Sequence, residues 1–462
     1  MVIRQSTFRR RKTVRARLQT GHELLVQGPA TARLVSGEVS SLAKPFLVDE
    51  PTTIRAGRLR IIEATAESEL DLTIGESGKT EEVEESTIPS DWIELVNKIA
   101  INSHISQRIM VLGGPDTGKN TLITYLSNTL LRRGFKVAVM DADMGQSEVG
   151  PPTTMSLAYL EKPIFELLEA KPYLIFFIGS TSPAYVIGRV LKGTEELMSH
   201  FNNTQGNRDL ILNMPGWISG EGAAKFVLQM ISKTSPDHLV SLEREKEVED
   251  ILKEVKPSVQ LTRLSVSPYT RPRTKEERKF LRETSYRKYF AGSRVFTIRY
   301  GEIDFSLLFS SIGKAAPLNV IREVENTVKS RVLYCEQGKF SINAIVARKA
   351  SLMTEILGET ADKEQEDGGE FATELKPNVQ KEIRVVPITE LSNLMVALID
   401  RKEQFVSLGI IKSLDFRSRQ ITVIAASRPS ELNRIEVGKV RITQEGYEIG
   451  YVQIRRIMLS PR

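Results

Sequence analysis

Residues 109–121 read Ile-Met-Val-Leu-Gly-Gly-Pro-Asp-Thr-Gly-Lys-Asn-Thr. The four apolar residues at the start are typical of a strand buried on both faces, and leucine and isoleucine recur at helical spacing from 122 to 131. Between them a glycine, four further residues and Gly118-Lys119 have the spacing of a phosphate-binding loop. Its backbone N–H groups would surround phosphate oxygens, while Lys119 reaches the β- and γ-phosphates. Motif and context together disfavour an ordinary glycine-rich turn, so the segment predicts a nucleoside-triphosphate site.

The candidate ATP ligands form one continuous run. They are Gly113, Gly114, Pro115, Asp116, Thr117, Gly118, Lys119, Asn120 and Thr121. One departure from the usual pattern is Asn120, which stands where a serine or threonine hydroxyl normally ligates Mg²⁺. An amide oxygen is also a hard ligand and could substitute, and a hydroxyl follows at Thr121. We therefore expect Mg²⁺ near Asn120 and Thr121, with Asp141 as a further candidate ligand.

The rest of the chain predicts an α/β fold with a mostly parallel, doubly wound sheet. Short apolar runs at 137–140, 175–178, 210–212 and around Val240 alternate with helical stretches, as in βαβ units. The flanks read instead as short strands separated by turn residues: 23–27, 58–63 and 69–74 before the core, and 331–335, 394–399, 407–414, 420–425 and 439–442 after it. The expected division is a basic tail (1–18), an N-terminal β-domain with linker (19–89), a P-loop domain (90–328) with an arginine lid at about 269–290, and a C-terminal β-domain (329–462) with an acidic insertion (355–378).

Two acids follow the apolar run at 137–140. Asp141 and Asp143 stand at the expected carboxyl end of a strand, where functional residues of open α/β sheets collect. Alternate residues of a strand face the same way, so one acid could serve Mg²⁺ while the other accepts a proton from an attacking hydroxyl. A solvated loop with paired acids is the alternative, and the upstream phosphate loop makes it less favoured.

Two later segments could contact substrate. Trp217, preceded by Gly216 at a strand end, offers a flat surface for a nucleobase, although a tryptophan is often simply a core residue. In the basic segment 271–287, Arg278 and Arg282 share one helical face and could neutralise charge during phosphoryl transfer. A charged surface helix explains that segment equally well.

Composition limits the class of protein. The chain has 462 residues, 40% hydrophobic and 26% charged, and a formal net charge of +6, with basic clusters at 1–18 and 271–294 that suit a phosphate-rich partner. A solvated tail and a charged helix would explain the clusters as well, and the tail also superficially resembles a mitochondrial presequence. The single Cys335, the lack of a signal-like start and the lack of a 20-residue apolar run predict an intracellular, cytoplasmic protein without a membrane span.

Taken together, these motifs resemble the polynucleotide 5′-hydroxyl-kinase family. It includes archaeal RNA kinases, the kinase subunit of the eukaryotic pre-mRNA cleavage machinery and the kinase of ribosomal RNA processing. The loop with its internal Asp116, the Asp-x-Asp-x-Gly-Gln at 141–146, Gly216-Trp217 and the arginines of 271–290 occur in the family's order, and so does His-Glu-Leu-Leu-Val-Gln-Gly-Pro at 22–29. The high charge suits an archaeal member.

The resemblance implies a role for each matching residue. Lys119 would contact the transferring phosphate, and Asp143 would be the general base for the 5′-hydroxyl of RNA, with DNA as an alternative acceptor. Gln146, Gly216 and Trp217 would hold the terminal nucleotide, and Glu23 would approach the nucleotide base. Arg278, Arg282 and Arg287 are the catalytic lid candidates. The donor is expected to be ATP with Mg²⁺, although other nucleoside triphosphates stay open.

Two other functions are compatible with a phosphate loop. One is an ATP-bound structural subunit of an RNA-processing complex with little turnover, which the retention of Lys119 and Asp143 argues against. The other is a GTPase, which is disfavoured because the chain has no Asn-Lys-x-Asp guanine-reading motif.

Overall fold

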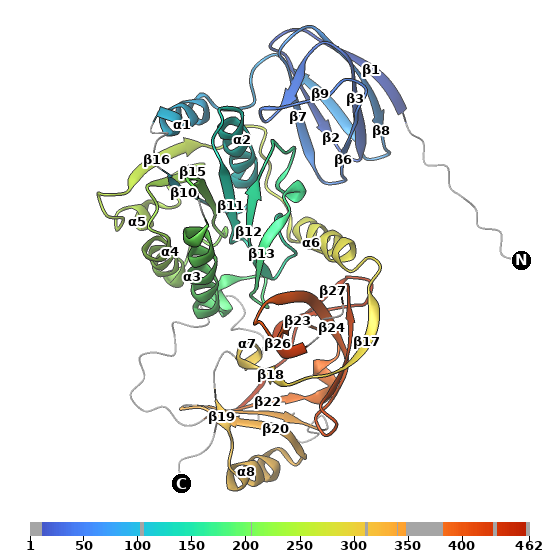
Figure 1. The fold of residues 1–462 in the computed structure, drawn as a ribbon, viewed down its shortest axis with the longest axis vertical. Helices are drawn as coiled ribbons and strands as arrows, with labels where there is room; N and C mark the ends of the chain where they lie inside the picture. Colours follow the sequence, from blue (N-terminus) through green and yellow to red (C-terminus); the bar gives the residue numbers. More distant parts are fainter. Residues whose placement is uncertain are drawn as a thin grey trace, which may run out of the picture.

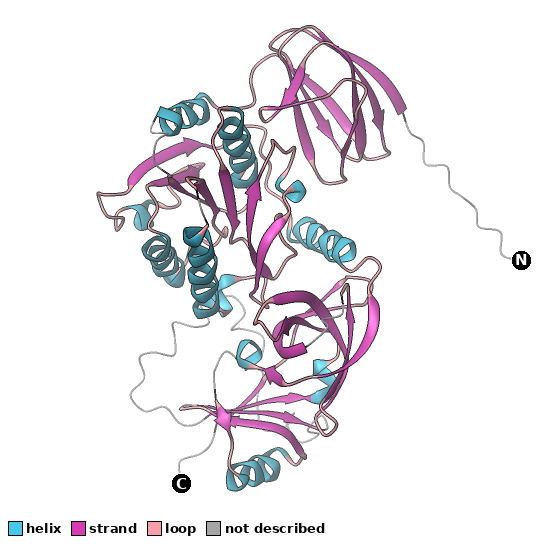
Figure 2. Cartoon of the chain, in the orientation of Figure 1, coloured by secondary structure: helices cyan, strands magenta, loops and turns pink. Residues whose placement is uncertain are grey.

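The computed structural model describes residues 12–101, 106–204, 206–309, 313–339, 341–347, 382–427 and 432–458. Its centre is a seven-stranded sheet in the order β13-β12-β11-β14-β10-β15-β16 (Figures 1 and 2). Five neighbouring strands are parallel: β11 (Val137–Asp141), β14 (Asp209–Asn213), β10 (Arg108–Gly113), β15 (His238–Glu243) and β16 (Gln260–Ser265). The carboxyl ends of these strands therefore meet at one edge of the sheet, where β10 leads into the phosphate loop.

Helices cover both faces of this sheet. Apolar side chains of α1 (Ser90–Ile101) and α2 (Lys119–Arg132) pack in the buried cluster on one face. The cluster on the other face contains side chains from α3 (Ile187–Asn203), α4 (Glu221–Thr234) and α5 (Glu249–Leu252). This arrangement confirms the expected α/β fold with a mostly parallel, doubly wound sheet.

One edge of the sheet differs from the expectation. The apolar run 175–178, expected as a buried parallel strand, belongs to β13 (Pro172–Phe177), which pairs antiparallel with β12 (Thr154–Leu160). Tyr173 on this edge strand is 63% exposed. A four-residue apolar run carries no information on strand direction, and no separate strand was expected at β12 or β16.

The N-terminal unit consists of two antiparallel sheets with a shared apolar core. One has the order β1-β8-β3-β6 and the other the order β5-β4-β7-β2-β9. Their bounds are β1 (Lys12–Leu18), β2 (Glu23–Gln27), β3 (Ala30–Ser36), β4 (Val39–Ser41), β5 (Lys44–Pro45), β6 (Pro51–Ile54), β7 (Leu59–Ala64), β8 (Ser68–Ile74) and β9 (Lys79–Val83).

The expected basic tail is wrong from residue 12 onward, and residues 1–11 lie outside the described residues. Lys12–Leu18 forms β1 and pairs along its whole length with β8. The basic side chains of β1 meet acids across the pair: Arg15 lies 2.8 Å from Asp71, and Arg17 lies 2.7 Å from Glu69. Cross-strand ion pairs of this kind turn an apparently tail-like basic segment into part of a sheet.

The C-terminal unit also has two sheets, in the orders β17-β25-β24-β23-β26-β18, with β27 on β26, and β19-β20-β21-β22-β28. The bounds of their strands are β17 (Arg294–Arg299), β18 (Glu302–Asp304), β19 (Lys314–Ala315), β20 (Val332–Gln337), β21 (Ser341–Val346), β22 (Glu382–Pro387), β23 (Leu394–Asp400), β24 (Phe405–Asp415), β25 (Gln420–Ala425), β26 (Leu432–Ile442), β27 (Glu448–Tyr451) and β28 (Arg455–Met458). Helices α7 (Ser306–Phe309) and α8 (Leu318–Val328) pack with these sheets, and a 3₁₀ turn occupies Ile388–Leu391. Two further 3₁₀ turns, at Leu167–Glu169 and Pro183–Tyr185, lie in the central unit.

The strand pairing places this unit's start earlier than the expected residue 329. β17 pairs with β25 and β18 pairs with β26, so the chain enters the C-terminal sheets directly after residue 292. The acidic insertion expected at 355–378 lies outside the described residues. Among the helices that the structure describes, none is long and apolar enough to cross a membrane.

Helix α6 (Lys275–Tyr289) connects the central sheet with the C-terminal unit (Figure 1). A capping box fixes its start: the Thr274 hydroxyl accepts the backbone N–H of Glu277, and the Glu277 carboxylate accepts the backbone N–H of Thr274. The arginine lid expected at about 269–290 therefore consists of a loop followed by this helix.

Candidate active site

The phosphate loop is held in shape by its own side chains. Thr117 Oγ1 donates to the Gly114 carbonyl at 3.0 Å, and Lys119 Nζ donates to the carbonyls of Gly113 and Gly114 at 2.9 and 2.8 Å. Gly118 has φ 95°, a left-handed conformation that favours glycine at the point where α2 begins. The curled loop and the helix N-terminus are the arrangement that binds phosphate oxygens.

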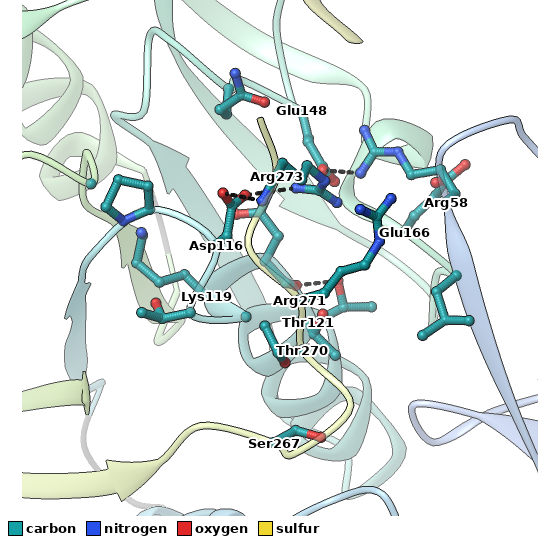
Figure 3. A pocket seen from close by; sticks show the side chains of 18 of the residues that line it. Arg58, Asp116, Lys119, Thr121, Glu148, Glu166, Ser267, Thr270, Arg271 and Arg273 are labelled. Atoms are coloured by element: carbon teal, nitrogen blue, oxygen red, sulfur yellow. Dashed lines mark hydrogen bonds and ion pairs between the residues drawn. The ribbon is translucent and has the colours of Figure 1, made fainter. Parts of the chain in front are cut away.

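The loop opens into a cavity of about 880 Å³ (Figure 3). Strands β2, β7 and β9 of the N-terminal unit form one side, and residues 215–219, 181–183 and 145–146 of the central unit form another. Residues 267–273 and α6 contribute a third. All three walls therefore converge on the phosphate loop.

The two acids at the carboxyl end of β11 have different surroundings. Asp141 is fully buried, and its carboxylate accepts from the backbone N–H groups of residues 143, 148 and 149 and from the side chains of Ser147 and Asn213. Burial and the charge of Asp143 raise the pKa of Asp141 to about 6. Asp141 thus shapes the loop that carries Asp143.

Asp143 lines the cavity, with its Oδ1 accepting the backbone N–H groups of Gly145 and Gln146 at 3.2 and 3.1 Å. Burial raises its pKa, and the charge of Lys119 limits that rise. Burial likewise lowers the pKa of Lys119, opposed first by Asp143. Lys119 and Asp143 are therefore each other's leading opposite charge in the cavity.

Asn120 belongs to a chain of polar contacts across the floor of the cavity. Its Oδ1 accepts from Asn213 Nδ2 at 3.1 Å, and its side chain also hydrogen-bonds with Glu148. Glu148 in turn forms an ion pair with Arg58, which lies in the turn directly before β7 (Figure 3). Burial alone would raise the pKa of Glu148, but Arg58, the Asn120 hydrogen bond and Arg273 bring it below its usual value.

The internal aspartate of the phosphate loop anchors the lid. Asp116 lies at φ 54°, and its carboxylate accepts the backbone N–H of Arg273 at 2.9 Å and a guanidinium N–H of Arg278 at 2.8 Å. A second contact joins it to the Arg273 guanidinium at 3.3 Å (Figure 3). Two lid arginines are thereby held beside the phosphate loop.

The other two lid candidates lie elsewhere. Arg282 lines the cavity, but its guanidinium binds the Glu448 carboxylate at two points, 2.5 and 2.8 Å, and so joins α6 to β27. Arg287 is absent from the cavity lining and lies over the rings of Phe280 and Tyr447 instead. Of the three expected arginines, Arg278 alone is bound to the phosphate loop.

The remaining expected residues divide in the same way. Gln146, Gly216 and Trp217 line the cavity, and a side chain at Gly216 would approach the Pro115 nitrogen to 2.9 Å. Trp217 is half-buried and packs against Phe226 as well. Glu23 is buried outside the lining, where it accepts from Ser86 and Thr87 and so holds the segment next to the cavity.

Sequence reasoning did not single out several charged residues of the cavity, among them Glu148, Arg58 and Arg273. Glu148 stands two positions beyond Gln146, so its signal was its place in a segment already singled out. Arg58 is 90 positions away from Glu148 and carries no motif, so its presence follows only from the packing of the N-terminal unit. Arg273 lay within the basic segment but was not distinguished from its neighbours.

A phosphate loop at the carboxyl edge of a parallel sheet, with acids and arginines around it, defines a P-loop nucleotide-binding protein. The chain is 30% identical over 372 residues to the polyribonucleotide 5′-hydroxyl-kinase of Methanocaldococcus jannaschii, which covers 79% of this chain and 94% of that protein. The chain therefore belongs to the polyribonucleotide 5′-hydroxyl-kinase family.

Further comparisons agree with this assignment. A family model described as the mRNA cleavage and polyadenylation factor CLP1 P-loop matches residues 113–292. The Clp1 protein of Xenopus laevis is 30% identical over 210 residues, 42% of this chain and 48% of that protein. Among solved structures, the wild-type Clp1p–Pcf11p (454–563) complex contains a chain with a TM-score of 0.64 at 13% identity, covering 93% of this chain and 98% of that one, which shows the shared fold.

Proposed function

We propose that this protein is a kinase that transfers the γ-phosphate of ATP to the 5′-hydroxyl end of RNA. The observation that carries the proposal is that Lys119 and Asp143 line one cavity at the phosphate loop, where each is the leading opposite charge of the other. A neutral hydroxyl is a poor nucleophile, and a partly buried carboxylate with a raised pKa is a better proton acceptor than an ordinary aspartate. Membership of the polyribonucleotide 5′-hydroxyl-kinase family supports the same substrate class.

In this proposal each wall of the cavity has one task. Lys119 and the lid arginines stabilise the charge of the transferring phosphoryl group, with Arg278 held in place by Asp116. Asp143 accepts the proton of the attacking 5′-hydroxyl. Gln146, Gly216 and Trp217 hold the terminal nucleotide, and the N-terminal strands face the adenosine end of ATP. Reaction in the cytoplasm stays a prediction.

The chemistry of the donors beside the phosphate loop fits Mg²⁺. Asn120, Thr121 and Glu148 supply hard oxygens, and Asn213 Oδ1 is a buried acceptor without a hydrogen-bond partner in the described residues. Asp141, by contrast, already accepts five hydrogen bonds, so we assign it to positioning. Bound Mg²⁺ would neutralise charge on the ATP phosphates, and Asn120 with Thr121 would hold it there.

The test is phosphate transfer from labelled ATP to matched 5′-hydroxyl RNA and DNA oligonucleotides. We expect wild-type protein to label RNA, and Lys119→Ala or Asp143→Ala to lower the rate by at least about 100-fold. Asp250→Ala is the matched control, because Asp250 lies on α5 with a 96% exposed side chain. Labelling of RNA by Asp143→Ala at the wild-type rate would remove the proposed base. Tight ATP binding without any labelling would instead favour an ATP-bound structural subunit.

A further inference from the structure

An exposed surface of aromatic and cationic side chains lies outside the cavity. We call it the outer aromatic surface and define it as Phe280 and Arg287 of α6 together with Tyr447 and Ile449 at β27. The three apolar side chains are 47%, 47% and 48% exposed. The Arg287 guanidinium lies 5.9 Å from the ring centroid of Phe280 and 5.4 Å from that of Tyr447, so one cation contacts both rings.

The geometry of this surface is fixed by its backbone. Arg287 donates to the Glu283 carbonyl at 3.3 Å and to Thr284 Oγ1 at 3.2 Å, which holds the guanidinium against its own helix. Gly446, at φ 85°, lets the turn before β27 approach closely, since a side chain there would come within 2.9 Å of the Arg287 backbone. Both rings are therefore presented on rigid elements.

The charge of the helix favours a polyanion. The exposed charged residues of α6 comprise a single acid, Glu276, and four cations: Lys275, Lys279, Arg287 and Lys288. The turn before β27 adds one exposed acid, Glu445. This excess of positive charge beside accessible rings is the combination that binds single-stranded nucleic acid, with bases stacked on rings and cations at phosphates.

The elements that carry the outer aromatic surface, α6 and β27, also contact the cavity lining through their other faces. Glu448, between Tyr447 and Ile449, binds the cavity residue Arg282. Further along β27, the Tyr451 hydroxyl lies 2.7 Å from Thr181 Oγ1 in the cavity wall. An RNA strand whose 5′ end occupies the cavity would therefore pass around α6 or β27 to reach the rings on their outer faces.

We propose that the outer aromatic surface binds the nucleotides of RNA that follow the phosphorylated 5′ end, by stacking bases on Phe280 and Tyr447. The proposal rests on the kinase function, because it takes the cavity as the place of the 5′ end. It gives the protein a preference for acceptors long enough to reach from the cavity to α6.

The test compares a 5′-hydroxyl dinucleotide with a 12-nucleotide single-stranded RNA. For a Phe280→Ala/Tyr447→Ala double variant we expect kcat/KM for the 12-mer to fall about 10- to 100-fold, while kcat/KM for the dinucleotide and KM for ATP stay at wild-type values. A Phe280→Trp/Tyr447→Trp double variant should restore kcat/KM for the 12-mer to near the wild-type value. Tyr173→Ala, which removes a 63% exposed aromatic on β13, is the matched control. An equal loss on both acceptors, or no loss on the 12-mer, would overturn the proposal, and the second result would point to a protein partner for this surface.

A binding measurement separates this proposal from the kinase function. Fluorescence anisotropy with labelled 12-mer needs no phosphate transfer, and we expect the double variant to bind about 10- to 100-fold more weakly at fixed salt. If wild-type protein binds the 12-mer in this ring-dependent way but labels no RNA, the surface stands and the kinase function fails. If labelling is normal while binding ignores the rings, the inference fails alone.

Discussion

At the scale of single residues, the two acids at the carboxyl end of β11 have distinct tasks. The five hydrogen bonds accepted by Asp141 fix the loop, whereas Asp143 faces the cavity with Lys119 as its leading opposite charge. Alternation along a strand predicted that both acids could face one site, but the chain turns directly after Asp141, so the second acid is placed by hydrogen bonds to the first. The position of the two acids in the sequence identified both as candidate site residues. Their different burial in the structure then distinguished the positioning residue from the candidate base.

The titration of this pair predicts the pH dependence of the kinase. A general base must be deprotonated, so activity should be lost as pH falls through the raised pKa of Asp143, and we expect the acidic limb of kcat/KM above the usual range of an aspartate. In Asp141→Asn the neighbouring negative charge is gone, so the remaining carboxyl should titrate at lower pH and the limb should shift in that direction. Rate measurements from pH 4.5 to 8 on both proteins check this, and an unshifted limb in the variant would contradict it.

At the scale of elements, the contact between the phosphate loop and the lid decides which arginines can act. A carboxylate in a phosphate loop would repel the phosphates unless its charge is matched. Here the Asp116 carboxylate is almost fully buried by Arg273 and Arg278, so its charge is matched before ATP enters. The capping box then starts α6 immediately after Arg273 and directs the helix toward β27.

Loosening this contact should weaken the use of ATP. Asp116→Asn keeps the shape of the side chain but removes the charge that orients two arginines, and hydrogen bonds to charged groups contribute about 1.5–3 kcal/mol. We expect kcat/KM for ATP to fall about 10- to 100-fold, measured by ATP titration at saturating RNA. Asp49→Asn, on a 74% exposed side chain of the N-terminal unit, should leave ATP use unchanged. An unchanged or higher value in Asp116→Asn would show that the aspartate does not position the lid.

At the scale of the whole molecule, the N-terminal, central and C-terminal units all contribute residues or supporting contacts to one site. The N-terminal unit reaches the phosphate loop through Arg58 and Glu148, and the C-terminal unit reaches the lid through Glu448 and Arg282. Both ion pairs are largely buried, and removal of one partner from a buried pair leaves the other charge desolvated and unpaired.

The Arg58–Glu148 pair, which joins the N-terminal unit to the central unit, should therefore cost more to break than the Arg33–Asp71 pair within the N-terminal unit. We expect Arg58→Ala to lower the free energy of unfolding by about 3–5 kcal/mol and to weaken ATP binding, because Glu148 lies beside Asn120. Arg33→Ala, at a half-exposed pair with Asp71, should cost about 0–1 kcal/mol. Urea denaturation and calorimetric titration with ATP measure both effects. A cost for Arg58→Ala no larger than that of Arg33→Ala would contradict the role of the pair.

The sequence by itself determined the class of fold, the phosphate loop and the acids that follow the next strand, because short-range spacing decides where backbone N–H groups turn and which strand ends carry polar residues. All but one of the strands predicted in the flanking units match an observed strand to within a few residues. The exception is the segment 439–442, which covers only the end of β26. The sequence did not decide strand direction at the β12–β13 edge, the start of the C-terminal unit or the partners of the lid arginines. These features, like the ion pairs around the cavity, depend on contacts between residues far apart in the sequence. Examples are Arg58 with Glu148, 90 residues apart, and Arg282 with Glu448, 166 residues apart. Only the packing of the units brings such charges together, and burial then decides how strongly they interact. The phosphate loop could therefore be predicted from residue spacing, whereas the charges around it required the tertiary structure.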